Sequence, residues 1–178
     1  MTGLLHGGAY AIFALMAVDA LLPVGGELIM LYAGALAAGA IAGQEPVVFG
    51  WHPATGFEAY VVLALAGTLG YLAGSLVGWE IGRRGGRPLL ERHGRRLHLD
   101  ASNLARAEAW FERWGDWAVF VGRVTPIVRS FVSIPAGVLE YPLGRYTVLT
   151  AIASLIWCLV FGIAGHALGS NWDSVPHL

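Results

Sequence analysis

The sequence contains no lysine, a single cysteine and few charged residues of any kind. Charged residues make up 13% of the chain and hydrophobic residues 56%. Soluble domains usually carry about 25% charged residues, so this composition excludes an ordinary soluble domain and indicates a membrane protein. The cysteine, Cys158, lies in an apolar run and has no second cysteine with which to form an internal disulfide.

Motifs typical of enzymes and of nucleic-acid-binding proteins are missing as well. The sequence has no P-loop and no dinucleotide-binding fingerprint, and Ser75 lacks the context of a nucleophile elbow. His93 and His98 have no acidic residue at metal-ligand spacing. We therefore predict a protein that is not an enzyme, holds no metal or cofactor and binds no nucleic acid.

The basic residues are concentrated in the middle of the chain. All eleven are arginines between Arg83 and Arg145, and eight of them lie between Arg83 and Arg113. Cytoplasmic loops of membrane proteins carry an excess of basic residues, so segment 83–116 is predicted to be cytoplasmic. Arg83 and Arg84 have two interpretations, a simple positive-inside anchor or a contact for anionic lipid headgroups.

Two apolar segments are long enough to cross a membrane. A span needs about 20 apolar residues, and segments 59–82 and 146–169 meet that length. In the first of them Gly70, Gly74 and Gly78 recur every fourth residue, a spacing that allows close helix packing in lipid. We predict that both segments are full transmembrane helices.

The basic segment also contains an amphipathic pattern. Leu104, Ala107, Phe111 and Trp114 are spaced so that they share one face of a helix. The pattern predicts a helix that ends near Trp114 and lies in the cytoplasm or at the inner membrane interface.

Residues 4–43 form an apolar segment that is broken near its middle. Pro23 and the glycines after it interrupt the segment, and Asp19 and Glu27 flank the interruption. One interpretation is two short spans with a tight turn. The other, which we favour, is a re-entrant hairpin whose tip lies inside the bilayer, because acidic residues beside unwound backbone form the midplane sites of many transporters.

Residues 117–139 form a second broken apolar segment, and this one carries positive charge. Arg123 and Arg129 flank Pro126, and proline removes a backbone donor and kinks or ends a helix. A charged residue at bilayer depth costs roughly 2.5–3.5 kcal/mol on insertion scales. Each arginine therefore needs an acidic partner, water or a bound anion, and we predict a second re-entrant hairpin opposed to the first.

A weak internal repeat relates the two broken segments. Pro23 stands ten residues before the pair Ala33–Gly34, and Pro126 stands ten residues before the pair Ala136–Gly137. Transporters often consist of inverted repeats with the binding site between two broken elements.

The charges beside the two breaks, Asp19, Glu27, Arg123 and Arg129, are the predicted functional residues. Opposed hairpins would allow each acid to meet an arginine. An arginine binds phosphate in bidentate geometry, and a buried carboxylate that alternates between an arginine and a proton can couple transport to a proton gradient. The alternative interpretation is a structural clasp between the hairpins.

The motifs around these charges resemble those of the DedA family, also called the SNARE-associated or VTT-domain family. The second broken segment is similar to the family's arginine, Pro-x-x-Arg and Ala-Gly pattern, here at Arg123, Pro126, Arg129 and Ala136–Gly137. The first is similar to the family's acid, Pro-rich turn, acid and Ala-Gly arrangement, here at Asp19, Pro23, Glu27 and Ala33–Gly34.

The resemblance implies one DedA-like membrane domain over residues 1–178 in the plasma (inner) membrane of a bacterium. It also implies a translocase that moves undecaprenyl phosphate, or a similar anionic polyprenyl lipid or phospholipid, between leaflets, driven by protons or membrane potential. By the matched motifs, Arg123, Arg129 and Pro126 would bind the lipid, and Asp19 and Glu27 would couple protons.

The expected fold is all-α: a polytopic membrane protein with two opposed re-entrant hairpins, two or more transmembrane helices and a cytoplasmic or interfacial amphipathic helix. Its expected partners are an anionic lipid and the bilayer, with a homodimer also possible. Two alternatives stay open, a proton-coupled transporter of a small solute or ion, and a membrane scaffold that transports nothing.

Overall fold

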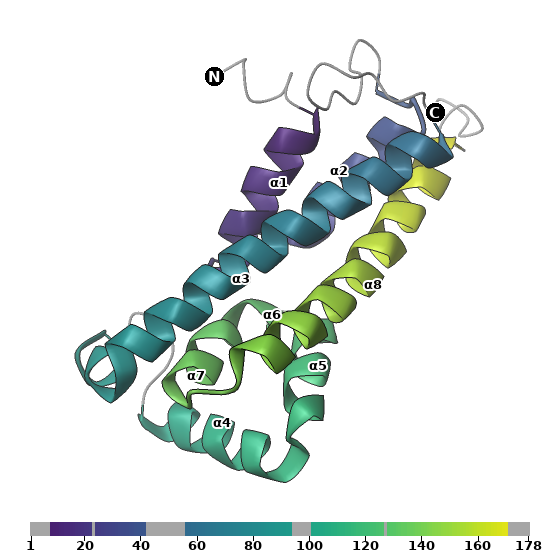
Figure 1. The fold of residues 1–178 in the computed structure, drawn as a ribbon. Coiled ribbons are helices and arrows are strands. Elements are labelled where there is room, and N and C mark those ends of the chain that lie inside the picture. The colour runs from purple at the N-terminus through teal and green to yellow at the C-terminus, as the bar shows by residue number, and fades with distance from the viewer. Residues whose placement is uncertain (1–7, 23, 42–55, 94–100, 127, 171–178) are drawn as a thin grey trace. The chain divides into compact units, whose positions relative to one another are not determined.

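The computed structural model describes residues 8–22, 24–41, 56–93, 101–126 and 128–170. Over these residues all regular secondary structure is helical, which confirms the predicted all-α class (Figure 1). The helices are α1 (Gly8–Asp19), α2 (Gly26–Ala37), α3 (Phe57–His93), α4 (Ala101–Trp114), α5 (Asp116–Val124), α6 (Val128–Phe131), α7 (Ser133–Val138) and α8 (Leu143–Ser170).

The chain divides into two compact units that share the two long helices. Unit 1 comprises Met1–Asp19, Val24–Tyr71 and Leu155–Leu178, and unit 2 comprises Ala20–Pro23 and Leu72–Ser154. Unit 1 therefore holds α1, α2, the first part of α3 and the last part of α8. Unit 2 holds the rest of α3, helices α4 to α7 and the first part of α8.

The two long helices coincide with the predicted transmembrane segments. Phe57–Gly86 of α3 and Leu143–Ser170 of α8 have 30 and 28 residues and are apolar enough to cross a membrane. Helix α3 extends beyond the predicted end at residue 82, and Gly86, at φ 51° and ψ −157°, interrupts its helical geometry. Pro88 follows two residues later, in the first turn of the next helical stretch, where proline is tolerated.

Helix α8 exposes apolar side chains and buries small and polar ones. The exposed stripe on this helix consists of Val148, Ile152, Ile156, Val160 and Ile163. Thr150, Ser154 and Cys158 are buried. This order is the reverse of the usual surface helix, which turns its apolar face to the core, and it suits a helix whose surroundings are lipid.

Helices α1 and α2 stand where the first broken hairpin is predicted. Each has 12 residues, or about 18 Å at 1.5 Å per residue. A hydrocarbon core is about 30 Å thick, so neither helix is long enough to cross it alone. The break between them is the predicted one. The ends of the predicted segment, residues 4–7 and 42–43, lie outside the described residues, and its re-entrant position stays a prediction.

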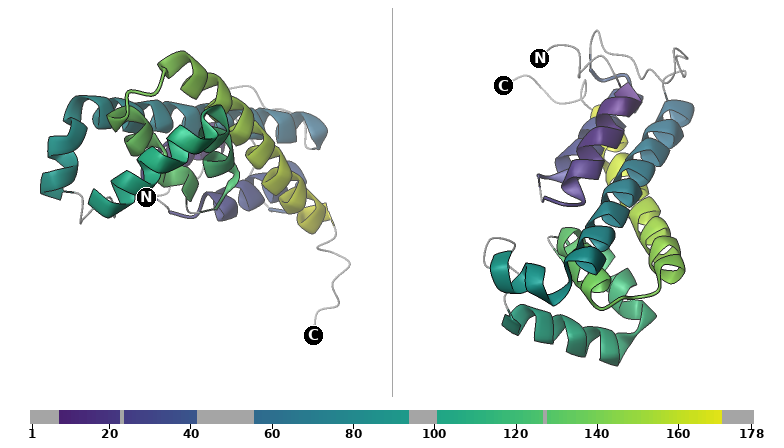
Figure 2. Two further views of the ribbon diagram at one scale, coloured as in Figure 1. Left: turned by 90° about the horizontal axis from the view of Figure 1, so that it is seen from below. Right: turned by 60° about the vertical axis from the view of Figure 1, so that its left-hand side comes forward.

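The second broken hairpin consists of three short helices in unit 2. Helix α5 ends before Pro126, and α6 and α7 form the returning arm. Helix α4 contacts both α5 and α7, and Figures 1 and 2 show these helices gathered together. The structure thus confirms a broken helical element at 117–139, while its place in the membrane stays a prediction.

Helix α4 confirms the predicted amphipathic helix but only part of its apolar face. Phe111 packs against a core cluster of Trp79, Val119, Ala136 and Tyr146. Trp114 was expected on the same face, but it is 46% exposed. The side chain of Leu104 lies outside the described part. Spacing alone cannot separate a core-facing aromatic residue from one that faces lipid, because both environments are apolar.

Glycines allow helices to approach closely in both units. In unit 1, a Cβ added to Gly70 would lie 2.1 Å from the carbonyl oxygen of Phe13, so α1 touches α3 there. In unit 2, a Cβ added to Gly78 would lie 2.8 Å from Cβ of Ser133. Both positions confirm the close packing that the four-residue glycine spacing predicts.

Candidate functional site

Asp19 holds the first break together. It is the last residue of α1 and is 2% exposed. Its Oδ1 accepts hydrogen bonds from the backbone N–H groups of Val24, Gly25 and Gly26, at 3.1, 3.1 and 2.9 Å. Gly25 has φ 101°, a left-handed conformation that glycine adopts without a steric penalty. One carboxylate oxygen therefore satisfies three amides where α2 begins, and negative charge is favoured at a helix N-terminus.

Glu27 lies in the first turn of α2 and is partly exposed. It follows directly after the amides that bond to Asp19. The two predicted acids thus occupy one short region of unit 1, the first deep in the turn and the second closer to the surface. A carboxylate in the first helical turn is favoured by the helix dipole.

Arg123 holds the second break together. It lies in the last turn of α5 and is 1% exposed. Its Nη1 donates to the carbonyl oxygen of Arg129 at 2.6 Å, and its Nη2 donates to Oγ of Ser133 at 2.9 Å and to the hydroxyl of Tyr146. Its Cζ also lies 5.3 Å from the centroid of the Tyr146 ring. One guanidinium therefore ties α5 to α6, α7 and α8.

Arg129 and Pro126 lie on either side of the turn. Pro126 follows Thr125, whose φ of −81° and ψ of 121° are extended, as expected for a residue before proline. Arg129 lies in α6 and is 2% exposed. Its backbone N–H donates to the carbonyl of Thr125 at 3.1 Å. The turn therefore brings two buried arginines to one short element of unit 2.

The four predicted charges divide between the two units. Asp19 and Glu27 belong to unit 1, and Arg123 and Arg129 belong to unit 2. Within each unit, the two residues of like charge lie close together in the chain, beside the same helix break. Contact between the acids and the arginines stays a prediction.

Arg83 and Arg84, the predicted headgroup contacts, share one acidic partner. Nε and Nη2 of Arg83 donate to the two carboxylate oxygens of Glu80, at 2.9 and 2.8 Å. Nε of Arg84 donates to Oε1 of the same residue at 2.6 Å. Both arginines are exposed, and the trio retains one net positive charge. Among the described residues, no group of three or more His, Cys, Asp or Glu could hold a metal ion.

Two partners of Arg123 were not singled out as site residues by sequence reasoning. Ser133 and Tyr146 are fully buried, and the hydroxyl of Tyr146 also bonds to the carbonyl of Ser75 at 3.2 Å. The available signal was indirect. Tyr146 opens the second transmembrane segment with a polar tip, and a buried tyrosine hydroxyl usually has a hydrogen-bond partner.

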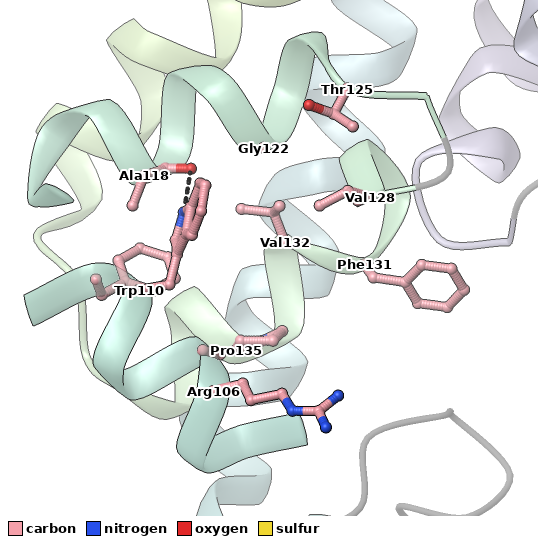
Figure 3. Close-up of a pocket in the computed structure, with 11 residues that line it drawn as sticks. Arg106, Trp110, Ala118, Gly122, Thr125, Val128, Phe131, Val132 and Pro135 are labelled. Atoms are coloured by element: carbon pink, nitrogen blue, oxygen red, sulfur yellow. Dashed lines mark hydrogen bonds between the residues drawn. The ribbon is translucent and has the colours of Figure 1, made fainter. Parts of the chain in front are cut away.

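An apolar cavity of about 360 Å³ lies in unit 2 beside the second break (Figure 3). Helix α4 contributes Trp110 to its wall, and the returning arm contributes Val132. The indole N–H of Trp110 donates to the carbonyl of Ala118 at 3.2 Å. Arg106 lies at the edge of the cavity, and Figure 3 shows its guanidinium extending away from the Trp110 ring.

Comparison with known proteins gives a consistent family. Residues 13–167 match the family model of the VTT domain. A protein of Bacillus subtilis (strain 168) named undecaprenyl phosphate transporter A is 34% identical over 129 residues, which cover 72% of this chain and 65% of that protein. A Staphylococcus aureus (strain NCTC 8325 / PS 47) protein of the same name is 28% identical over 166 residues, which cover 93% and 76%.

A third relative carries a different name. The alkaline phosphatase-like protein of Lactococcus lactis subsp. lactis (strain IL1403) is 33% identical over 135 residues, which cover 72% of this chain and 63% of that protein. The chain therefore spans less than two thirds of the length of the Bacillus subtilis and Lactococcus lactis relatives, at 65% and 63%. No solved structure matches the chain.

Proposed function

The chain belongs to the VTT-domain family, and from this we propose that it moves an anionic polyprenyl phosphate lipid between the leaflets of a bacterial inner membrane. The observation that carries the proposal is the burial of Arg123 and Arg129, 1% and 2% exposed, at a helix break in an apolar segment. Two relatives named undecaprenyl phosphate transporter A support the choice of lipid. In this proposal residues 1–178 act as one membrane domain, with segment 83–116 in the cytoplasm.

The phosphate is proposed to bind at the second break. Arg129 and Arg123 supply the positive charge, and Pro126 keeps the local backbone out of regular helix. Charge-assisted hydrogen bonds to phosphate are about twice as strong as neutral ones. An arriving headgroup therefore competes with Ser133 and Tyr146 for the guanidinium of Arg123, and phosphate binding would loosen the bonds that hold α5 against α7 and α8.

The two broken elements are proposed to be re-entrant hairpins. Their arms are too short to cross the bilayer, since α1 and α2 have 12 residues each and α5 has nine. Irregular backbone at membrane depth is stable only where protein or a water-filled cavity covers it. In this proposal the headgroup enters at the second break, while most of the hydrocarbon chain stays in lipid.

We assign proton coupling to the acids of the first break, and to Glu27 before Asp19. Oδ1 of Asp19 already accepts three backbone hydrogen bonds, so its first role is to form the turn. Glu27 is partly exposed and is the better placed of the two to exchange protons with water. In proteoliposomes, Glu27→Gln should bind the lipid normally but lose the dependence of transport on a pH gradient. Gradient-dependent transport equal to wild type would refute this assignment.

The test of the main proposal is lipid binding measured by native mass spectrometry in nanodiscs. Undecaprenyl phosphate is titrated against wild type, Arg129→Ala and Arg145→Ala, with phosphatidylglycerol as the anionic control lipid. Arg145 is the matched control because its side chain is 68% exposed, so its loss removes one charge outside the buried site. Selective binding that Arg129→Ala abolishes and Arg145→Ala preserves would support the proposal.

Equal binding of both lipids by all three proteins would refute the proposal. Inorganic phosphate is measured in the same samples, because one relative is named an alkaline phosphatase-like protein. Release of phosphate from undecaprenyl phosphate would contradict the assignment as a transporter that is not an enzyme.

A scaffold that transports nothing is the second candidate. Its supporting observation is that Arg123 donates to three protein acceptors, which is the behaviour of a structural residue. A scaffold predicts that Arg129→Ala lowers thermal stability and leaves lipid selectivity unchanged. The translocase predicts the loss of selectivity.

A further inference from the structure

The second broken hairpin carries both the buried arginine network and part of the wall of the apolar cavity. Three residues that line the cavity are each followed in the chain by a buried polar residue, in the pairs Gly122–Arg123, Val128–Arg129 and Val132–Ser133. Arg123 and Ser133 bond to each other at 2.9 Å, and Gly122 and Val132 line the cavity. The two arms of the hairpin therefore carry both the arginine network and part of the cavity wall.

The cavity wall offers almost no hydrogen-bonding groups. Helix α4 contributes Ala107, Trp110 and Phe111 to it, and the indole N–H of Trp110 is already bonded to Ala118. The hydroxyl of Thr125 donates to the carbonyl of Val121 at 2.8 Å. The cavity volume of about 360 Å³ is at the lower end of the roughly 300–1,000 Å³ of ligand pockets. It therefore suits an apolar segment of a ligand and not a whole lipid.

The charge beside the cavity is positive. Arg106 is the charged member of its described lining and is exposed, so an anionic group is attracted to this edge. Arg106 would attract an anionic lipid towards this part of unit 2, while Arg123 and Arg129 bind its phosphate and the apolar wall contacts its hydrocarbon chain. A purely apolar partner would gain nothing from Arg106.

We infer that this cavity holds part of the hydrocarbon chain of the transported polyprenyl phosphate, while the neighbouring arginine network binds the phosphate. The inference rests on the proposed function. A chain that moves from bilayer to cavity gains no hydrophobic free energy, because lipid tails are as apolar as the protein. What the cavity adds is van der Waals contact with a chain of matching shape. It therefore sets selectivity among lipids, and the arginines bind the phosphate common to them.

Filling the cavity tests this inference. Val128 lines it and is 45% exposed, whereas Val124, on the other side of the same turn, is 40% exposed and does not line it. We compare Val128→Trp with Val124→Trp by native mass spectrometry, with undecaprenyl phosphate and phosphatidylglycerol as probes. Val128→Trp should raise the Kd for undecaprenyl phosphate about tenfold, which corresponds to about 1.4 kcal/mol. Val124→Trp should leave it unchanged.

A second variant guards against a folding defect. Ala107→Phe fills the cavity from α4 and should reproduce the loss of affinity. A cooperative thermal unfolding transition shows whether each variant is folded. If both filled variants are folded and bind undecaprenyl phosphate as wild type does, the inference is wrong and the proposed function stands.

Two further outcomes would also overturn the inference. If filling the cavity weakens the binding of phosphatidylglycerol as much as the binding of undecaprenyl phosphate, the cavity accepts any acyl chain. The inference of a polyprenyl site is then wrong. If wild type itself shows no preference for undecaprenyl phosphate, the proposed function fails and the inference fails with it.

Discussion

Arg123 meets Tyr146 through two different parts of the same side chain. Nη2 of the guanidinium donates to the phenol hydroxyl, and Cζ lies 5.3 Å from the ring centroid. Tyr146 in turn bonds to the carbonyl of Ser75 at 3.2 Å. The residues are 23 positions apart in the chain, so this contact fixes the second break against α8 and α3 within unit 2.

The first prediction concerns the hydroxyl of Tyr146. Tyr146→Phe keeps the ring but removes one acceptor from Nη2 of Arg123, which still donates to Oγ of Ser133. Hydrogen bonds to charged groups contribute about 1.5–3 kcal/mol, so the free energy of unfolding should fall by about that amount. Denaturant unfolding in detergent measures it. Ser133→Ala and the double mutant complete a cycle, and strictly additive effects would show that the two hydroxyls do not share Arg123.

A second prediction concerns Gly137, where α7 touches α3. A Cβ added at this position would lie 1.9 Å from the carbonyl oxygen of Trp79 and 2.8 Å from the amide nitrogen of Arg83. Both neighbours are backbone atoms and cannot rotate away, so Gly137→Ala should force the helices apart. Overpacking of this kind costs about 1–3 kcal/mol, and thermal unfolding of the purified protein measures the loss.

Gly144 provides the matched control for Gly137. It lies in α8, and an added Cβ would meet nothing within 4 Å. Alanine is favoured over glycine within helices by up to about 1 kcal/mol, so Gly144→Ala should be neutral or slightly stabilising. If the two substitutions had equal effects, the close contact between α7 and α3 would be wrong.

Much of the fold is predictable because each signal is local. The apolar runs predict α3 and α8, and Pro126 predicts the second break without any tertiary information. The predicted repeat also has a structural counterpart. A Cβ added to Gly34 would lie 2.1 Å from the carbonyl oxygen of Gly162. A Cβ added to Gly137 would lie 1.9 Å from the carbonyl oxygen of Trp79. The corresponding glycine of each half thus packs on the backbone of a long helix within its own unit.

The partners of the buried charges were not predictable in the same way. A charge in an apolar run signals that some partner exists, because an unpaired charge is costly. It does not say which group is the partner. Asp19 uses backbone amides, which every residue except proline has, so they leave no sequence signal. Arg123 uses hydroxyls brought near it by folding. The exposure of Trp114 was not predictable for a similar reason, since an apolar side chain suits both the protein core and lipid.

A third prediction concerns pH and lies outside the spanning segments. Tyr141 donates a hydrogen bond to Asp116, whose Oδ1 is 3.6 Å from Nη1 of Arg145. Burial, followed by the bond to Asp116 and its negative charge, raises the pKa of Tyr141 to about 12. Because the folded-state pKa is above the unfolded value of about 10, the stabilisation is fully present below pH 10. It is lost as pH rises towards 12.

Tyr141→Phe should therefore be less stable than wild type at neutral pH, by about 1 kcal/mol for a lost hydrogen bond. The difference should shrink between about pH 10 and pH 12. Thermal unfolding at several pH values measures it, and ultraviolet absorbance of tyrosinate gives the titration directly. A difference in stability that stays constant up to pH 12 would refute the raised pKa.

The last prediction concerns a buried hydroxyl that no described protein group satisfies. Thr150 is 0% exposed, and its Oγ1 has no hydrogen-bond partner among the described residues. A buried polar group without a partner costs about 1–3 kcal/mol, so Thr150→Val should leave the protein equally stable or make it more stable. Thr147 is the control on the same helix, because it is partly exposed and its Oγ1 donates to the carbonyl of Leu143 at 2.8 Å.

Thermal unfolding of the two variants separates the possibilities. Thr147→Val should change the free energy of unfolding by less than about 0.5 kcal/mol, as substitutions away from the buried core usually do. If Thr150→Val instead destabilises the protein by more than about 1 kcal/mol, the hydroxyl has a partner in the folded protein. Since Thr150 lies one helical turn beyond Tyr146 on the same face of α8, that result would extend the polar network of Arg123 along this helix.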